Sequence, residues 1–398
     1  MKQLNSQFKQ FKTTAAITRL LALCFALISS ICCFNFASIK QLSNPIFAAS
    51  SSAKAMCVLD KDSKRVLYCK NQNQSLPMAS TTKVVTAITV LENCKDLNQV
   101  ITINKHAVGV EGTSIYLRQD EQISVMDLLY GLMLRSGNDS ATALAYHVGG
   151  SVDGFASLMN NFAKKVGAKN SHFVNPHGLD NPNHYTTAYD LALITCHALN
   201  NPTFKQIVST KNHIIPATNK SDKRYLTNKN RLLSSLTGCC GVKTGFTSKA
   251  GRCLVSACER NNRTTVCVVL NCGPMFEESV DLIESSFEDY SNKKVVDKNK
   301  EIYNEYLLDN KAGRLYLYAE KDVYCPIKQG EEDKIQIKYS VKLDDAHQGS
   351  EVGKIDVFLD NQLINSAKLY TMNKIEKFLD NKTLQIKEIL WEEEINEN

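Results

Sequence analysis

The placement of strand-like segments at both ends of residues 53–292 limits the fold more than any other feature. "KAMCVLD" and "KRVLYCK" read as two strands joined by a polar turn at 60–64, while "GVKTGF", "RCLVSAC" and "TTVCVVLNC" read as strands after position 240. Helical patterns occupy the residues between them. The simplest arrangement is one sheet, built from both ends of this domain and packed against helices.

Several helices of the middle region are visible in the sequence. In "SVMDLLYGLMLR", Ser124 and Asp127 have the spacing of a capping box at the start of an apolar helical pattern. "SATALAYHV" and "FASLMNNFAKKVG" repeat the helical period. A last helix, "EESVDLIESSFEDY", precedes the polar stretch "SNKKVVDKNKE", which we interpret as the domain boundary.

Beyond that boundary the hydrophobic period changes to two. Apolar and polar residues alternate through 335–343 and again through 355–359, which predicts a small all-β domain over 298–372 with one buried face. Residues 373–398 have apolar positions at helical spacing and are expected to form an amphipathic helical tail. This tail holds four lysines and seven acids, a balance that is poor for binding an anionic membrane surface.

The net charge is concentrated at the N-terminus. The whole chain carries 47 basic and 41 acidic residues, but the first fifty residues hold five of the basic ones and no acid. The remainder is therefore nearly neutral, with 42 basic residues against 41 acidic ones. A nucleic-acid partner would require a net basic face, so we expect none.

Residues 1–50 have the layout of an export signal. A cationic stretch is followed by an apolar run over 20–39 and by small residues at Ala48, Ala49 and Ser50. An uncleaved anchor is the alternative, because the apolar run approaches the length that spans a bilayer. We expect an exported protein of the cell envelope, either secreted or attached to the outer face of the cytoplasmic membrane.

Fourteen cysteines raise the question of disulfides in an exported protein. Three lie in the expected signal, which leaves an odd number, and several of the others occupy strand positions where a small buried side chain would serve. Cys57 and Cys69 flank the first hairpin and could pair, but we expect mostly free thiols. No paired C-x-x-C motifs occur, so neither a metal nor a cofactor is predicted.

Ser80 and Lys83 stand three positions apart at the start of an apolar helical pattern. A serine there often caps the helix by accepting hydrogen bonds from free backbone N–H groups. Residues at i and i+3 also share a helix face, so the lysine amine could reach the serine hydroxyl. A desolvated lysine can act as the base that turns a serine into a nucleophile. The pair alone does not decide between the two readings.

Two further motifs bear on that choice. Ser136-Gly137-Asn138 lies between two predicted helices, and Lys243-Thr244-Gly245 begins a predicted strand. Each alone is weak, since S-G-N is common in turns and K-T-G at solvated strand ends. The order S-x-x-K, S-G-N, K-T-G within one domain is much more specific.

With these motifs the chain resembles the serine-type D-alanyl-D-alanine carboxypeptidases, the low-molecular-weight penicillin-binding proteins of peptidase family S11. The resemblance covers about residues 53–372 and extends to "VLYCKNQNQSLPMASTTK", "NPHGLDNPNHYTTAYDLA" and "NKNRLL". It implies an α/β (α+β) fold of the β-lactamase and DD-peptidase type, with a central antiparallel sheet packed by helices and a small C-terminal all-β domain. The implied partners are the peptidoglycan stem peptide as substrate and β-lactams as inhibitors.

The resemblance also assigns roles within the three motifs. Ser80 would attack the carbonyl between two D-alanines, and Lys83 would take its proton, with burial and a nearby cation at Lys243 lowering the lysine pKa. Ser136 would relay a proton to the leaving D-alanine, and Asn138 would hold the substrate amide and orient Lys83. Lys243 and Thr244 would meet the terminal carboxylate of the substrate, and the backbone N–H groups of Ser80 and Phe246 would form the oxyanion hole. Gly245 belongs to the same substrate-binding motif.

Two positions depart from the family pattern. Phe246 stands where well-known members often have histidine, and Met275 stands where the family tends to carry a carboxylate-binding arginine. The first change should alter substrate shape more than acyl chemistry. The second puts the carboxylate clamp in doubt and leaves a DD-endopeptidase as an alternative.

A β-lactamase and a non-catalytic penicillin-binding sensor or wall-binding module would share the same three motifs. A class A β-lactamase needs a glutamate between the second and third motifs, yet none occurs between Glu121 and Glu259. A sensor would have a spanning helix after the catalytic domain, and no such pattern follows it. His177 and His184 are expected to staple a Gly/Asn/Pro-rich loop and not to catalyse.

Overall fold

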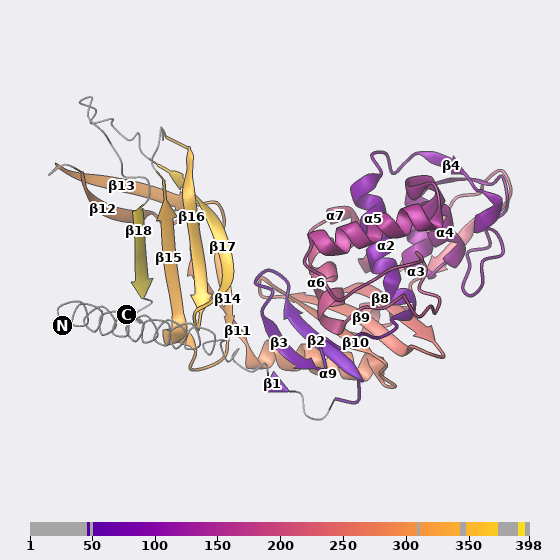
Figure 1. Cartoon of the computed structure of the whole chain (residues 1–398), viewed down its shortest axis with the longest axis horizontal. Helices are drawn as coiled ribbons and strands as arrows, with labels where there is room; N and C mark the ends of the chain where they lie inside the picture. The colour runs from indigo at the N-terminus through magenta and orange to yellow at the C-terminus, as the bar shows by residue number, and fades with distance from the viewer. Residues whose placement is uncertain (1–45, 48–50, 309–310, 343–347, 373–388, 395–398) are drawn as a thin grey trace, which may run out of the picture. The chain divides into compact units, whose positions relative to one another are not determined.

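The computed structural model describes residues 46–47, 51–308, 311–342, 348–372 and 389–394 (Figure 1). The expected export signal, residues 1–50, therefore lies outside the described residues except for the short strand β1 (Ile46–Phe47). Among the helices that the structure does describe, none is both long enough and apolar enough to cross a membrane.

The catalytic-type domain is organised on one six-stranded sheet. The strands β2 (Ala55–Asp60) and β3 (Val66–Lys70) share this sheet with three strands from the other end of the domain, and β2 pairs with β10 (Arg263–Leu270) in antiparallel register. The prediction of one sheet built from both ends is confirmed. In spatial order the strands are β1, β3 (Val66–Lys70), β2 (Ala55–Asp60), β10 (Arg263–Leu270), β9 (Gly251–Arg260) and β8 (Cys239–Thr247).

Successive side chains of each strand point to opposite faces of this sheet, and each face packs into its own hydrophobic core. On β2, Cys57 and Leu59 pack into the larger core, whereas Met56 and Val58 pack into the core shared with the helix α9 (Met275–Asp289). The larger core is covered by the remaining long helices (Figure 1), namely α2 (Lys83–Asn93), α3 (Val125–Leu134), α4 (Asn138–Gly149), α5 (Val152–Lys165), α6 (Ala188–Ala198) and α7 (Pro202–Ser209).

Side-chain hydrogen bonds to backbone N–H groups determine where helices such as α3 begin. Ser124 caps α3, because its side chain accepts a hydrogen bond from the Asp127 backbone N–H at 3.0 Å. The N-cap expected at Ser124 is thus confirmed, while the Asp127 carboxylate accepts from the Ser124 hydroxyl at 2.7 Å. Short elements complete the domain: the turn η1 (Ala79–Thr82), η2 (Lys105–Ala107), α8 (Leu232–Ser235) and two two-stranded antiparallel sheets, β4–β5 (Val100–Thr102, Gln122–Ser124) and β6–β7 (Asn212–Ile215, Arg224–Thr227).

The C-terminal part is an all-β domain, as expected. In β15 the buried side chains alternate with half-exposed ones, because one face packs on a core of its own. The larger sheet runs β12 (Ile302–Leu308), β13 (Lys311–Ala319), β17 (Gln362–Thr371), β16 (Glu351–Leu359), β15 (Ile335–Val341) and β18 (Ile389–Glu394), with a short turn, η3 (Glu332–Lys334), before β15.

Two expectations for this domain need correction. The polar stretch interpreted as a boundary contains the strand β11 (Ser291–Val296), which pairs with β14 (Val323–Ile327), so the β domain begins earlier than residue 298. The tail over 373–398 is not a helix at 389–394, where it forms the strand β18. The free edge of β15 offers backbone hydrogen bonds to β18, and this pairing outweighs the helical spacing. Residues 373–388 and 395–398 lie outside the described part of the chain.

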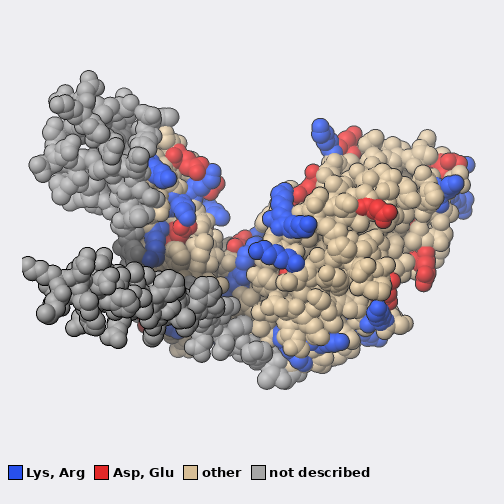
Figure 2. All heavy atoms as spheres, viewed as in Figure 1, with Lys and Arg blue, Asp and Glu red and all other residues tan. Residues whose placement is uncertain are grey.

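All eleven cysteines of the described residues are free thiols. Cys57 and Cys69 are indeed cross-strand partners on β2 and β3, but they do not form a disulfide. On the face of the molecule in Figure 2, basic and acidic side chains both occur, and in several places they lie next to one another.

Candidate active site

Ser80 lies inside a helical turn and does not cap it. The turn η1 continues directly into α2, and its local carbonyls are bound by the hydroxyls of Thr81 and Thr82. Ser80 Oγ instead stands 3.0 Å from Lys83 Nζ. The geometry therefore favours the interpretation of Ser80 and Lys83 as an interacting pair over the interpretation of Ser80 as a helix cap.

Lys83 is fully buried and has three polar neighbours. Its Nζ lies 2.7 Å from Asn138 Oδ1, 2.7 Å from the carbonyl oxygen of His177 and 3.0 Å from Ser80 Oγ. Burial lowers the pKa of Lys83 well below its usual value, and the nearby cations Lys243 and Lys229 lower it further. The site thus favours a neutral amine beside the serine hydroxyl.

The S-G-N motif is held by the segment 111–117. The Asn138 backbone N–H donates to the carbonyl of Thr113 at 2.7 Å, and the side-chain Nδ2 donates to the carbonyl of Glu111. Because Nδ2 is bound there, the amide oxygen of Asn138 faces Lys83. Ser136 is buried at the start of this motif, with a left-handed backbone (φ 64°), and its carbonyl accepts from Thr113 Oγ1.

The K-T-G motif lies on the edge strand β8, beside the Ser80 turn. A Cβ atom on Gly245 would stand 3.1 Å from the Ser80 backbone nitrogen, so only glycine allows this close approach. Lys243 is buried and donates to the carbonyl of Thr244 at 2.9 Å. Burial and the charge of Lys229 lower the pKa of Lys243 to about 7. Phe246 is exposed at the end of the motif.

Sequence reasoning missed Lys229, which is a third cation of this site. Lys229 is exposed by its solvent-accessible surface, yet partial desolvation followed by the charge of Arg135 lowers its pKa. Its backbone N–H donates to the carbonyl of Leu134, just before the S-G-N motif. The only available signal was its place in the segment "NKNRLL".

The two histidines staple a loop, as expected. His184 Nε2 lies 2.9 Å from Thr82 Oγ1, and His184 Nδ1 accepts from the Val174 backbone N–H. His177 Nδ1 accepts from the Leu179 backbone N–H. Burial, together with Lys83 and the other histidines, lowers the pKa of His177 to about 3 and that of His184 to about 4. Both rings are therefore neutral at physiological pH.

Met275 begins α9 and packs against the apolar core beneath that helix. Its side chain therefore serves packing. No arginine occurs in 264–276, so this segment does not supply the family's carboxylate-binding arginine.

Comparison with known proteins gives the same assignment as the motifs. Residues 40–273 match the family model of D-alanyl-D-alanine carboxypeptidases, and residues 290–377 match that of the penicillin-binding protein 5 C-terminal domain. The chain belongs to the D-alanyl-D-alanine carboxypeptidase family.

Individual members of the family match over most of their length. The D-alanyl-D-alanine carboxypeptidase DacA of Haemophilus influenzae is 32% identical over 340 residues, covering 81% of this chain and 85% of that protein. DacF of Bacillus subtilis is 28% identical over 324 residues, with 78% and 83% coverage. The solved structure of penicillin binding protein 5 from Haemophilus influenzae aligns with a TM-score of 0.66 at 29% identity, covering 82% of this chain and 98% of that one. These matches confirm the expected fold, a central antiparallel sheet with helices and a C-terminal all-β domain.

Proposed function

We propose that this carboxypeptidase removes the terminal D-alanine from peptidoglycan stem pentapeptides through an acyl-enzyme on Ser80. The observation that carries the proposal is the position of the buried Lys83 amine, 3.0 Å from the Ser80 hydroxyl. A serine needs such a base to become a nucleophile at neutral pH.

The hydrogen-bond inventory of Lys83 supports its role as the base. A neutral amine has two N–H donors and one lone pair. The Asn138 amide oxygen and the His177 carbonyl can only accept, so they take the two donors. The lone pair is then left facing Ser80 Oγ, in position to receive its proton.

The remaining steps use the other motif residues. Attack of Ser80 Oγ on the carbonyl carbon between the two D-alanines forms an oxyanion, which the backbone N–H groups of Ser80 and Phe246 would stabilise. Collapse breaks the amide bond, and Ser136 would relay a proton to the departing amine. Water then attacks the acyl-enzyme, releasing the shortened peptide and restoring Ser80. Lys243 and Thr244 would hold the substrate carboxylate during these steps.

A β-lactam presents its reactive carbonyl to the same serine, so we propose that Ser80 also forms the penicillin adduct. Intact-mass measurement of the wild type after penicillin treatment should show one adduct, located on the Ser80 peptide. Ser80→Ala should show none, and an adduct that persisted in this variant would assign the nucleophile elsewhere.

The reaction itself is tested on purified pentapeptide muropeptides by mass spectrometry. Loss of one alanine from monomeric muropeptides supports the carboxypeptidase. Cleavage of cross-linked dimers without loss of alanine from monomers would instead make the chain a DD-endopeptidase.

We further propose that the protein acts outside the cytoplasm, on the cell wall. Support comes from the signal-like pattern of residues 1–50 and from the location of the substrate. Detection of the chain in the envelope fraction, with the N-terminal residue of the mature protein determined, would test both export and signal cleavage.

A further inference from the structure

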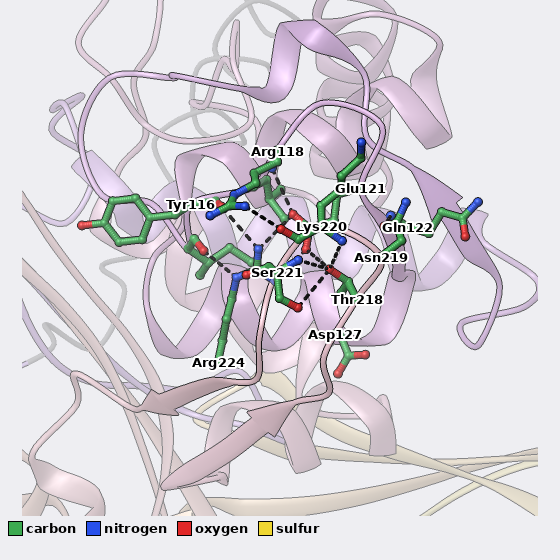
Figure 3. Close-up of polar contacts among 12 residues, drawn as sticks. Tyr116, Arg118, Glu121, Gln122, Asp127, Thr218, Asn219, Lys220, Ser221 and Arg224 are labelled. Atoms are coloured by element: carbon green, nitrogen blue, oxygen red, sulfur yellow. Dashed lines mark hydrogen bonds and ion pairs between the residues drawn. The ribbon is translucent and has the colours of Figure 1, made fainter.

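An exposed tyrosine beside the S-G-N motif is held in an unusual backbone conformation. Tyr116 is 82% exposed, and its backbone is left-handed, with φ 62°. Side chains other than Asn, Asp and Gly rarely adopt this conformation because the Cβ atom crowds the backbone. Figure 3 shows the Tyr116 ring extending away from the polar cluster that surrounds its main chain.

Two other residues with this rare backbone conformation lie at the catalytic motifs. In the described residues only four that are not Gly, Asn or Asp have a positive φ, and Tyr116 is one of them. Two of the others are Ala79, just before the nucleophile, and Ser136 of the S-G-N motif; the fourth, Lys64, lies in the turn between β2 and β3. Strained backbone of this kind is retained mostly where function requires it.

The backbone of Tyr116 is fixed from both sides. Its N–H donates to Ser114 Oγ at 2.8 Å, and its carbonyl accepts from Arg224 Nη2 at 3.3 Å. The carboxylate of Asp139, the residue after the S-G-N motif, accepts from the N–H groups of both neighbours, Ile115 and Leu117. These neighbours are buried, so only the tyrosine side chain projects outward.

A buried ion pair holds Arg224 in place (Figure 3). Glu121 is fully buried and lies 2.7 Å from Arg224 Nη1, while Arg224 Nε donates to the carbonyl of Ile115 at 2.8 Å. Burial alone would raise the pKa of Glu121, but hydrogen bonds from Arg224, the Arg118 N–H and the Thr218 hydroxyl outweigh it and lower that pKa. The carboxylate therefore stays charged and keeps the guanidinium against the segment 111–117.

The segment places Tyr116 near the acyl side of the site. The Thr113 carbonyl is bound to Asn138, and three residues of chain, at most about 10 Å, lead from there to Tyr116. The family resemblance assigns Asn138 to the substrate amide, so a peptide bound at Ser80 would pass beside Asn138 and this segment.

We propose that Tyr116 is a specificity-determining residue that contacts the stem peptide upstream of the two D-alanines. Its ring offers a rigid flat surface of low conformational entropy, which suits an extended peptide. Long stem peptides reach this ring and minimal substrates do not. This inference rests on the proposed carboxypeptidase function.

The experiment compares kcat/KM for a pentapeptide muropeptide and for a short acylated D-alanyl-D-alanine dipeptide. Tyr116→Asn keeps a residue that tolerates the left-handed backbone but removes the ring. It should lower kcat/KM for the long substrate roughly three- to tenfold through KM, while the short substrate changes less than twofold. Tyr116→Phe should behave as the wild type on both.

Tyr225→Asn is the matched control, because Tyr225 is also a largely exposed tyrosine and its side chain leaves the strand β7 on the face opposite to Arg224. It should leave the ratio of the two substrates unchanged. An equal loss on both substrates in Tyr116→Asn, or no loss on either, would overturn the inference. Turnover and penicillin acylation of the wild type test the proposed function separately, since they do not depend on Tyr116.

Discussion

Gly245→Ala tests how closely the edge strand β8 packs against the turn that carries Ser80, the proposed nucleophile. A Cβ atom at this position would stand 3.0 Å from the Met78 carbonyl oxygen, 3.0 Å from the Thr81 nitrogen and 3.1 Å from the Ser80 nitrogen. All three are backbone atoms of the rigid turn, so they cannot rotate away. Turn and strand must separate by a few tenths of an ångström.

A shift of this size is comparable to the whole range of donor-to-oxyanion distances that an oxyanion hole allows. Donors must lie within about 2.7–3.1 Å of the developing oxyanion, and removing one donor costs about 10²–10³ in kcat. Because the methyl group displaces the Ser80 N–H without deleting it, we expect acylation to slow by roughly 10- to 100-fold. Overpacking should also lower the free energy of unfolding by about 1–3 kcal/mol.

Stopped-flow acylation by a fluorescent penicillin, together with thermal unfolding, would measure both effects. Gly273→Ala is the matched control, since no atom lies within 4 Å of the place that its new methyl group would take. It should acylate within twofold of the wild type. If Gly245→Ala acylated within threefold of the wild type, the strand would not position the oxyanion donor, and the reasoning would fail.

Three further changes probe the charged groups of the molecule. Lys83→Ala should fold but acylate penicillin at least about 10²-fold more slowly, the scale for losing a general base; a rate within threefold of the wild type would rule out that role. Because the folded-state pKa of Lys243 is lowered to about 7, the unfolded chain binds more protons above that pH, so the contribution of Lys243 to stability rises as pH increases toward 10. Urea titrations should show a steeper rise in the wild type than in Lys243→Met, in which the lowered pKa of Lys83 still gives part of the rise, and equal slopes would contradict the reasoning. Glu121→Gln leaves the largely buried Arg224 guanidinium, whose side chain is 11% exposed, without its counter-charge and should lower the free energy of unfolding by about 3 kcal/mol. An unchanged urea midpoint would show that the pair is not needed.

Local sequence patterns were sufficient for much of the fold and for the central pair of the site. The spacing of Ser80 and Lys83 places both on one side of a helical turn, and the Ser124 cap depends only on residues three positions apart. The sheet could be predicted because strand patterns stood at both ends of the domain. Each of these inferences uses only the spacing of residues along the sequence and the repeat of a helix or a strand.

Contacts made by backbone groups of loops could not be predicted in this way. The carbonyls of Glu111 and His177 hold Asn138 and Lys83, yet any residue type supplies a carbonyl, so composition carries no signal for them. The Glu121–Arg224 pair joins residues 103 positions apart and requires the tertiary fold. The strand β18 was missed because edge pairing with β15 overrode a helical spacing.

The buried free thiols allow local unfolding of each domain to be measured by alkylation, without introducing new cysteines. Burial raises the pKa of Cys196, Cys267 and Cys325 to about 12, and the thiolate is the form that alkylating reagents attack. These side chains should therefore react only during transient unfolding of their surroundings. Cys325 belongs to the C-terminal β domain, and the other two cysteines belong to the catalytic domain. Mass spectrometry can measure the rate of alkylation at each cysteine separately. Comparing these rates with and without substrate or penicillin bound at Ser80 would show whether binding reduces transient unfolding in one domain or in both.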